Sequence, residues 1–423
     1  MSETRTPIID DDEAIEELTT RAITEIYPSA DDLAVELRSG RILTAYIGID
    51  PTATDLHVGH ESQLLKLRRL QKLGHNVIML IGDFTGMIGD PSDKSAARVK
   101  LTRDEVLHNA EGYKKQASEI IDFDDPVNPA QIKYNSEWLG KMTFEEVVEL
   151  ASEFSVQQML ERDMFKRRIN EKTPVWLHEF LYPLMQGWDS VAMNVDIEVG
   201  GSDQIFNMLV GTTLVKRFLD KQKFVIAGQL MVDPSGRKIG KTEGNMVTLT
   251  DTPSDMYHKV MLWSDEITPH ALELCTSVPM SQIKEIENQL STGALSGIEG
   301  KRFLARTIIT DLYGEKEATS AEAIYDALTS SDYASIESSK EIMPSYVQVG
   351  QNLIDILHNS GIAASRSAAR RLIESGAVRI NGQKIEDSDW TIGDTKESLM
   401  LQVGKKKREN FRKLILDEPH ETG

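Results

Sequence analysis

Cysteine is almost absent from this sequence. Cys275 is the single cysteine among 423 residues, so a disulfide within the chain is excluded. Disulfide frameworks are typical of secreted proteins, whereas reducing compartments keep thiols free. We therefore expect a cytoplasmic protein.

Long apolar runs are also absent. No stretch approaches the roughly 20 consecutive apolar residues that a membrane-spanning helix needs. Residues 10–13 are all acidic, unlike the basic start of a secretory signal peptide. The sequence therefore predicts no signal peptide and no membrane partner.

Positive charge is scarce over the chain as a whole. Lys and Arg number 47 against 67 Asp and Glu, for a net charge of −20. This balance excludes a protein that coats nucleic acid with its whole surface, and we expect no DNA partner. With 40% hydrophobic and 27% charged residues, the chain has the composition of a globular protein and the length for two or three domains.

The stretch from Tyr46 to His60, YIGIDPTATDLHVGH, is the most informative local pattern. Its apolar start, residues 46–49, predicts a strand. Pro51 ends that strand because proline has no backbone N–H to donate to a neighbouring strand. The tetrapeptide HVGH at residues 57–60 then opens the next element.

An amphipathic helix follows the tetrapeptide, and Gly74 is its predicted end. Residues 76–81 predict the next buried strand. The helix is indicated by leucines on one face at positions 64, 67, 70 and 73. A strand, a turn, a helix and a strand form a βαβ unit, whose turn lies at a helix N-terminus that favours phosphate binding.

His57 and His60 in this turn have three possible roles. Their imidazoles can donate hydrogen bonds to a phosphate or to charge that develops on it. They can instead belong to a metal site, although a third ligand is not evident nearby, or they can cap the helix for structural reasons alone.

A second pattern, KIGKT at residues 238–242, favours the phosphate role. It lies in a glycine-containing loop after Gly236. Isolated loop lysines are usually solvated charges, but HVGH and KIGKT occur here as a pair. In this order they resemble the two signatures of the class I aminoacyl-tRNA synthetases.

A polar pocket is predicted from the segment 176–195. Tyr182, Gln186 and Asp189 are spaced by four and three residues, so they share one face of a helix. Buried polar groups need partners, and this face is therefore expected to bind a small polar ligand. The turn GGSDQ at residues 200–204 and the glycine-rich loop 82–98, which contains Asp90, are expected at the same pocket.

The C-terminal part reverses the sign of the charge. Residues 345–416 contain 12 Lys and Arg against 8 Asp and Glu. The pattern predicts one helix near 353–357, a second at 365–373 with Ser365 as its cap, and a hairpin over 377–385 with an Asn-Gly turn. The charge favours a nucleic-acid contact over a merely solvated helix and hairpin, and the segment resembles the S-four RNA-binding fold.

Taken together, the chain resembles the bacterial-type tyrosyl-tRNA synthetase family over nearly its whole length. The matching pieces are YIGIDPTATDLHVGH, TGMIGDP, EFLYPLMQGWDS, GGSDQ, GRKIGKT and the C-terminal module. The expected fold is α/β: a Rossmann-like catalytic domain with a parallel sheet over 1–245, including a helical N-terminal segment and inserted helices. An α-helical anticodon-binding domain over 246–335 and a small α+β S-four domain over 345–416 follow.

The resemblance implies an ATP-dependent, AMP-forming tyrosine–tRNA ligase. Tyrosine and ATP give tyrosyl-adenylate and pyrophosphate, and the tyrosyl group then passes to the 3′ end of the tRNA for tyrosine. The family is usually homodimeric. Magnesium is expected to accompany ATP, without a dedicated protein metal site.

The resemblance also implies roles for individual residues. The tyrosine phenol is assigned to Tyr46 and Asp189, its ammonium group to Asp90, Tyr182 and Gln186, and its carboxylate to the vicinity of Gln204. ATP and its phosphates are assigned to Gly48, Asp50, Thr52, His57, Gly59, His60, Asp203, Lys238, Lys241 and Thr242. Lys94 and Arg98 match a mobile loop that helps pyrophosphate leave, and RNA binding is assigned to Arg366, Arg370, Arg371, Lys405, Lys406, Lys407 and Arg408.

Departures and alternatives remain. Trp188, Glu198 and Ile205 differ from residues common in the family, although none of them replaces a catalytic group. The alternatives are tryptophanyl-tRNA synthetase, an HxGH nucleotidyltransferase that acts without RNA, and an RNA-binding protein on an inactive synthetase core.

Overall fold

The computed structural model describes residues 8–91, 101–232, 246–330, 342–395, 398–404 and 410–416. The chain divides into two compact units. The first takes residues 1–250 and 264–300, and the second takes 251–263 and 301–423. The helices between 253 and 330 are therefore shared between the two units. Among the described residues, no helix is both long and apolar enough to cross a membrane.

A six-stranded sheet forms the centre of the first unit, in the order β1-β6-β5-β2-β3-β4. Five strands are parallel, and β1 runs antiparallel to β6. The strands are β1 (Ile23–Tyr27), β2 (Thr44–Ile49), β3 (Asn76–Ile81), β4 (Gln131–Tyr134), β5 (Ile197–Gly201) and β6 (Phe224–Gly228).

The sheet differs from the sequence-based prediction at its two edges. The prediction of a parallel sheet is wrong for β1, and neither β1 nor β4 was expected. Both are edge strands in which most residues stay at least partly exposed, so they lack the continuous apolar run of a buried strand.

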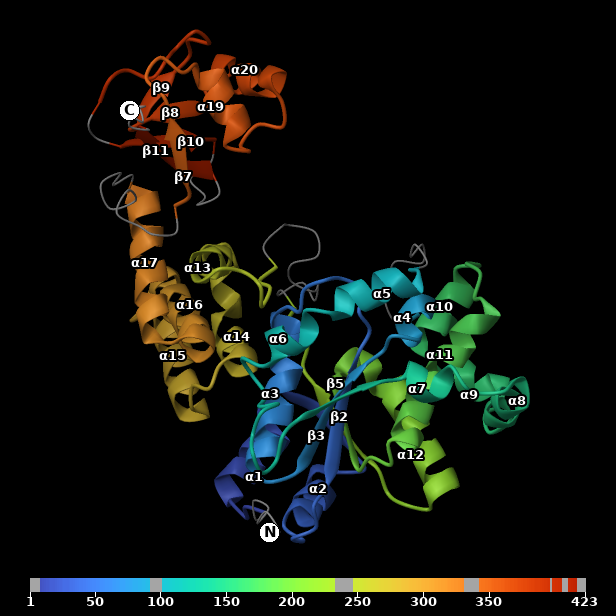
Figure 1. The fold of residues 1–423 in the computed structure, drawn as a ribbon. Coiled ribbons are helices and arrows are strands. Elements are labelled where there is room, and N and C mark those ends of the chain that lie inside the picture. The colour runs from blue at the N-terminus through green and yellow to red at the C-terminus, as the bar shows by residue number, and fades with distance from the viewer. Residues whose placement is uncertain are drawn as a thin grey trace. The chain divides into compact units, whose positions relative to one another are not determined.

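Helices cover both faces of this sheet. Figure 1 shows α3 (Val58–Lys72) on one side of the strands and α11 (Leu177–Ala192) with α12 (Ile205–Leu219) on the other. The others are α1 (Asp12–Thr20), α2 (Ala30–Leu37), α4 (Thr85–Ile88), α5 (Arg103–Ala110), α6 (Tyr113–Ala117), α7 (Ser136–Leu139), α8 (Phe144–Ser152), α9 (Val156–Leu160), α10 (Asp163–Asn170), α14 (Thr268–Cys275) and α15 (Met280–Thr292).

The βαβ unit has the predicted form. His57 is the N-cap of α3, the leucines at 64, 67 and 70 are buried, and the helix ends before Gly74, which has φ of 93°. β3 covers the predicted residues 76–81 and pairs in parallel with β2 over six residues. This register brings the C-terminal ends of β2 and β3 to the same edge of the sheet.

Helices α11 and α12 approach each other closely. A Cβ atom at Gly187 would lie 2.9 Å from Leu214 Cδ1 and 3.1 Å from the backbone nitrogen of Gly211. Larger residues at 187 would therefore push the two helices apart. The short separation fixes the positions of the side chains that both helices direct toward the C-terminal ends of the central strands.

The second unit contains α13 (Pro253–Met261), most of α16 (Gly297–Tyr313) and α17 (Glu315–Ser330). A five-stranded sheet follows in the order β7-β11-β10-β8-β9, with two helices packed on it. These elements are β7 (Pro344–Val347), α19 (Leu353–Asn359), α20 (Arg366–Glu374), β8 (Val378–Ile380), β9 (Gln383–Ile385), β10 (Leu399–Val403) and β11 (Phe411–Leu416).

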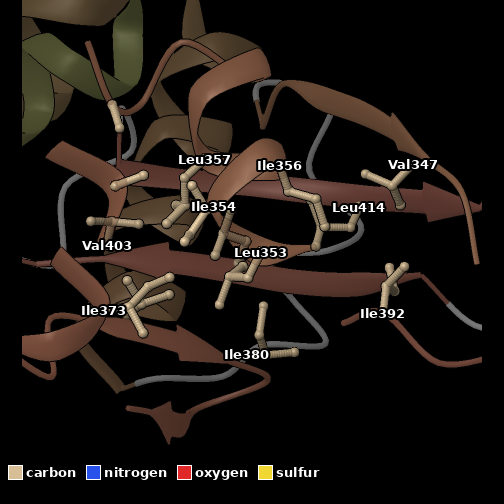
Figure 2. Packing of buried hydrophobic residues seen from close by; sticks show 14 residues of the cluster. Val347, Leu353, Ile354, Ile356, Leu357, Ile373, Ile380, Ile392, Val403 and Leu414 are labelled. Atoms are coloured by element: carbon tan, nitrogen blue, oxygen red, sulfur yellow. The ribbon is translucent and has the colours of Figure 1, made fainter. Parts of the chain in front are cut away.

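The C-terminal elements share one apolar core, shown in Figure 2. Leu353, Leu357 and Ile373 from the two helices pack with Leu414 from the sheet. The predicted helices and hairpin are confirmed. Ser365 accepts a hydrogen bond from the amide of Ala368, and the two turn residues, Asn381 and Gly382, have positive φ angles of 47° and 80°, as an Asn-Gly hairpin turn requires.

Candidate active site

A cavity of about 380 Å³ opens at the C-terminal edge of the central sheet. Crevices at this edge are the usual ligand sites of parallel α/β folds. Every sequence-predicted site residue of the first unit that the structure describes lines it. These residues are Tyr46, Gly48, Asp50, Thr52, His57, Gly59, His60, Asp90, Tyr182, Gln186, Asp189, Asp203 and Gln204.

Other predicted residues cannot be placed in this way. Lys94, Arg98, Lys238, Lys241, Thr242 and Lys405–Arg408 lie outside the described residues. The chain on both sides of 233–245 is described, however, and Leu230, Met231 and Met246 line the cavity. Just downstream, Val58 N donates to Val247 O at 3.1 Å, so this flank runs beside the HVGH turn.

The two histidines interlock at the start of α3. His57 Nδ1 accepts a hydrogen bond from Gly59 N at 3.1 Å, and His60 Nδ1 accepts one from His57 N at 3.2 Å. Their rings stack with centroids 4.0 Å apart. Because each Nδ1 accepts, the neutral tautomer carries its proton on Nε2, and each ring is a donor through that atom.

This geometry bears on the three possible roles of the histidines. The capping role is present, because His57 and His60 form a reciprocal capping box. Gly59 is needed for it, since a Cβ there would lie 2.9 Å from His57 Cε1. For the metal role, no group of three potential ligands among His, Cys, Asp and Glu is found within the described part of the chain.

One end of the cavity combines a buried phenol and a buried carboxylate. Tyr46 is 0% exposed and its hydroxyl lies 2.9 Å from Ser190 Oγ. Asp189 Oδ1 accepts from Trp138 Nε1 at 2.6 Å, and Asp189 Oδ2 accepts from Asn135 Nδ2 at 3.3 Å. These two donors hold the carboxyl group in one orientation.

Burial dominates the electrostatics at this end. Burial raises the pKa of Asp189 well above its usual range, while the hydrogen bonds from Trp138 and Asn135 oppose the shift. Burial also raises the pKa of Tyr46, and the nearby charges of Glu198 and Asp189 add to the effect. The Tyr46 phenol therefore stays protonated and can act as a hydrogen-bond donor.

A second group of polar side chains at the cavity includes the carboxylates of Asp50 and Asp90. Tyr182 Oη donates to Asp50 Oδ2 at 2.8 Å. Gln204 Nε2 donates to Asp90 Oδ2 at 2.7 Å, and Arg162 lies 3.6 Å from Asp90 Oδ1. Several carboxylates around one cavity favour a ligand with a positively charged group.

Sequence reasoning missed several residues that hold these groups in place: Asn135, Trp138, Arg162, and Lys223 together with Ser190. Asn135 and Trp138 follow β4, an edge strand without an apolar signal. Arg162 precedes α10, in a segment expected only as inserted helices. Lys223 lies just before β6, where a single charged residue carries no periodic signal. Each of these residues is distant in sequence from its partner, and only the tertiary fold brings the two together.

The predicted RNA-contacting side chains of the second unit lie on α20. Ala369 and Ile373 face the core, and Arg366, Arg370 and Arg371 are exposed. Arg366 pairs with Asp355, with a nitrogen–oxygen distance of 2.5 Å. The helix therefore presents a basic surface opposite its buried side.

Comparisons with known proteins agree with this arrangement. Residues 38–330 match the family model described as tRNA synthetases class I (W and Y). Residues 335–408 match the model of the tyrosine–tRNA ligase SYY-like C-terminal domain.

Curated relatives are similar over most of their length. The chain is 40% identical to the tyrosine–tRNA ligase of Carboxydothermus hydrogenoformans over 419 residues, covering 95% of this chain and 98% of the relative. It is also 40% identical to that of Mannheimia succiniciproducens, over 92% and 95% of the two chains.

Solved structures are similar as well. A C-terminally truncated mitochondrial tyrosyl-tRNA synthetase of Coccidioides posadasii is 25% identical, with a TM-score of 0.60, over 74% of this chain and 91% of that chain. The corresponding Aspergillus nidulans structure has the same fold, with 23% identity and a TM-score of 0.62, over 74% and 94% of the two chains.

Proposed function

The chain belongs to the tyrosine–tRNA ligases among the class I tRNA synthetases, and we propose how its cavity carries out the reaction of this family. It is an ATP-dependent ligase that activates tyrosine and transfers the tyrosyl group to tRNA. The model matched by residues 38–330 covers tryptophan and tyrosine enzymes alike. The C-terminal match and the relatives are tyrosine enzymes, so nothing favours the tryptophan enzyme or an enzyme that acts without RNA.

We propose that the substrate tyrosine lies with its phenol between Tyr46 and Asp189. Its ammonium group is placed among Asp90, Tyr182 and Gln186, and its carboxylate beside Gln204. The observation that supports this arrangement is the single cavity that these side chains line together. Asp189 has the rigid donors Trp138 and Asn135 behind it, and a fixed acceptor suits recognition of one hydroxyl group.

ATP is proposed to bind with its phosphates at the start of α3. His57, His60 and Thr52 line that part of the cavity, and the backbone of Gly48 and Gly59 permits close approach. Asp50 and Asp203 are assigned to the nucleoside or the adjoining wall. Lys238, Lys241 and Thr242 are proposed to close over the phosphates. This placement is supported by Leu230, Met231 and Met246, which flank their segment and line the cavity. Lys94 and Arg98 are proposed to aid the departure of pyrophosphate.

The chemistry needs positioning and positive charge, but no protein nucleophile. The tyrosine carboxylate attacks the α-phosphate of ATP in line, and tyrosyl-adenylate and pyrophosphate form. Imidazole and lysine donors stabilise the negative charge that gathers on the phosphates in the transition state. Since the described residues offer no group of three metal ligands, we propose that Mg²⁺ enters with ATP, and no step here depends on an ion held by the protein.

Binding of tRNA is proposed for the C-terminal half of the chain. The helices within 246–335 are assigned to the anticodon end. The module 345–416 is assigned to further RNA contacts through Arg366, Arg370, Arg371 and Lys405–Arg408. The exposed basic side of α20 supports this assignment, because phosphate contacts come from exposed Arg and Lys side chains.

A homodimer is proposed from an exposed apolar surface of the first unit. Phe144, Val156, Trp176 and Leu177 are 83%, 65%, 60% and 80% exposed. They lie on α8, on α9 and at the start of α11, and α8 contacts α11. Large exposed apolar side chains on neighbouring helices are typical of a protein interface. Analytical ultracentrifugation of the wild type and of Phe144→Asp/Leu177→Asp tests it, with a monomeric wild type as the contrary result.

The decisive experiment for the activity is ATP–pyrophosphate exchange with each standard amino acid in turn. Tyrosine alone is expected to stimulate the exchange strongly. Stimulation by tryptophan in preference to tyrosine would contradict the assignment. The single cysteine supports the cytoplasm as the proposed compartment.

A further inference from the structure

A buried ion pair lies at the tyrosine end of the cavity, where Glu198 is one of the lining residues, and the proposed activation chemistry does not use it. Glu198 on β5 and Lys223 just before β6 are 2% and 0% exposed. Lys223 Nζ donates to Glu198 Oε2. A buried ion pair contributes little to stability compared with apolar residues of similar size, so stability alone does not account for its presence.

The lysine uses all three of its protons within this cluster. Besides Glu198 Oε2, Nζ donates to Met208 O at 3.0 Å and to Ser190 Oγ at 3.1 Å. An ammonium group has three donors and no acceptor. Ser190 Oγ must therefore act as the acceptor in its contact with Lys223.

Ser190 transmits this constraint to the cavity. Its own proton has two acceptors within reach: Tyr46 Oη at 2.9 Å and Glu198 Oε2 at 3.3 Å. The contact with Tyr46 is the shorter, and Glu198 Oε2 already accepts from Lys223. Either hydroxyl can be the donor in the contact between Ser190 and Tyr46. When Ser190 donates, the order of donors runs from Lys223 to Ser190 to Tyr46, and the phenol proton of Tyr46 can then point to a ligand.

The backbone of α12 leaves room for this cluster. A Cβ atom at Gly211 would lie 2.5 Å from Lys223 Nζ, 3.1 Å from Ser190 Oγ and 3.3 Å from Glu198 Oε2. Gly211 has no side chain, and this allows the ion pair to pack against α12. The other oxygen of Glu198 accepts from Gln186 Nε2 at 3.0 Å, so the pair also orients a second side chain of the cavity.

We propose that Lys223 and Ser190, with Glu198 as counter-ion, are positioning residues that fix Tyr46 as a hydrogen-bond donor to the substrate. This inference rests on the proposed placement of the tyrosine ring at Tyr46 and Asp189. The substrate oxygen accepts from Tyr46, and the substrate proton goes to Asp189. The site therefore selects a 4-substituent that both accepts and donates, which a phenol does and an aromatic amine does poorly.

The test compares tyrosine with 4-aminophenylalanine, whose nitrogen donates well and accepts weakly. ATP–pyrophosphate exchange gives kcat/KM for both amino acids in the wild type, in Ser190→Ala and in Lys223→Met/Glu198→Gln. The double variant removes both charges together and so leaves no unpaired buried charge. We expect the preference for tyrosine to fall by about tenfold or more in both variants, with the KM for ATP unchanged. Thr213→Ala, on the exposed side of α12, is the matched control.

A purely structural role predicts a different result. Activity towards both amino acids would then fall in parallel with the melting temperature, and their ratio would stay at the wild-type value. A double variant that melts as the wild type does and keeps the wild-type ratio overturns the inference. A wild type that tyrosine does not stimulate overturns the proposed function itself, which separates the two failures.

Discussion

Tyr182 Oη donates a 2.8 Å hydrogen bond to Asp50 Oδ2. This bond joins the middle of α11 to the residue that follows β2, and both residues line the cavity. The other oxygen of Asp50 accepts from Thr85 Oγ1 at 2.7 Å. The Asp50 carboxylate is thus held from two sides, between the part of the cavity assigned to tyrosine and the part assigned to ATP.

Tyr182→Phe is expected to weaken tyrosine binding. The change removes the hydroxyl that is proposed to contact the substrate ammonium group and that donates to Asp50, which raises the KM for tyrosine by roughly tenfold. Steady-state exchange kinetics measure it. Tyr257→Phe removes a comparable bond to Glu322 in the second unit and is expected to leave the KM for tyrosine unchanged. Equal effects of the two substitutions would contradict the role of Tyr182.

The Asp189 carboxyl group is expected to decide tyrosine recognition. Asp189→Ala should raise the KM for tyrosine strongly and leave the KM for ATP nearly unchanged, because only the phenol end loses its acceptor. Trp138→Phe should reproduce part of the loss, since Trp138 Nε1 donates to Asp189 Oδ1 at 2.6 Å. Exchange kinetics with each substrate varied separately provide the measurement. A Trp138→Phe enzyme with wild-type kinetics would remove that residue from the site.

The imidazole of His57 is expected to act in the transition state. Because His57 also caps α3, alanine would mix a folding effect with a catalytic one. His57→Asn keeps a favourable N-cap residue and removes the ring. Single-turnover kinetics should then show adenylate formation slowed by about 10²–10³-fold, with tyrosine affinity and melting temperature close to wild type. Normal rates with weakened tyrosine binding would contradict a phosphate role.

Lys66 is expected to make stability depend on pH. It is 1% exposed, and burial lowers its pKa to about 7, with Arg69 and Arg21 contributing to the shift while Cys275 and Glu273 oppose it. The unfolded side chain has a pKa of about 10.4. Between these values the unfolded chain binds more protons than the folded one. The contribution of Lys66 to stability is therefore complete above about pH 10.4 and is lost as the pH falls through about 7.

Urea unfolding of the wild type and of Lys66→Met between pH 7 and pH 9.5 checks this linkage. Relative to the variant, the wild type should gain stability with rising pH, by at most about 1.4 kcal/mol per pH unit. Lys72→Met, on the exposed face of the same helix, should leave the wild-type slope unchanged. Parallel curves for the wild type and Lys66→Met would show that this lysine is not responsible.

The basic side of α20 is expected to matter for tRNA and not for tyrosine activation. Arg370→Ala/Arg371→Ala should lower the rate of tRNA charging and reduce its salt dependence, because fewer counterions are released on binding. Exchange without tRNA should be unaffected. Arg370→Lys/Arg371→Lys keeps the two charges and should retain most of the charging activity. Charging by the alanine variant at the wild-type rate and salt slope would exclude an RNA role for α20.

Some parts of this protein follow from the sequence by itself. The strand, turn and helix around HVGH, the shared face of Tyr182, Gln186 and Asp189, and the C-terminal helices and hairpin are all determined locally. Each depends on residues a few positions apart, through helical or strand periodicity, an N-cap or an Asn-Gly turn. Such signals are visible in a single chain because neighbours in sequence remain neighbours in space.

Other parts were decided only by the tertiary structure. The edge strands β1 and β4 are half-exposed, and their positions depend on the strands beside them rather than on a pattern of their own. Asn135 reaches Asp189 across 54 positions, and Lys223 reaches Glu198 across 25. A buried lysine or asparagine has no sequence periodicity that reveals its partner, because the partner is set by how α11, α12 and the sheet pack together. The outline of the cavity was therefore predictable from local pattern, whereas the side chains that orient its polar groups were not.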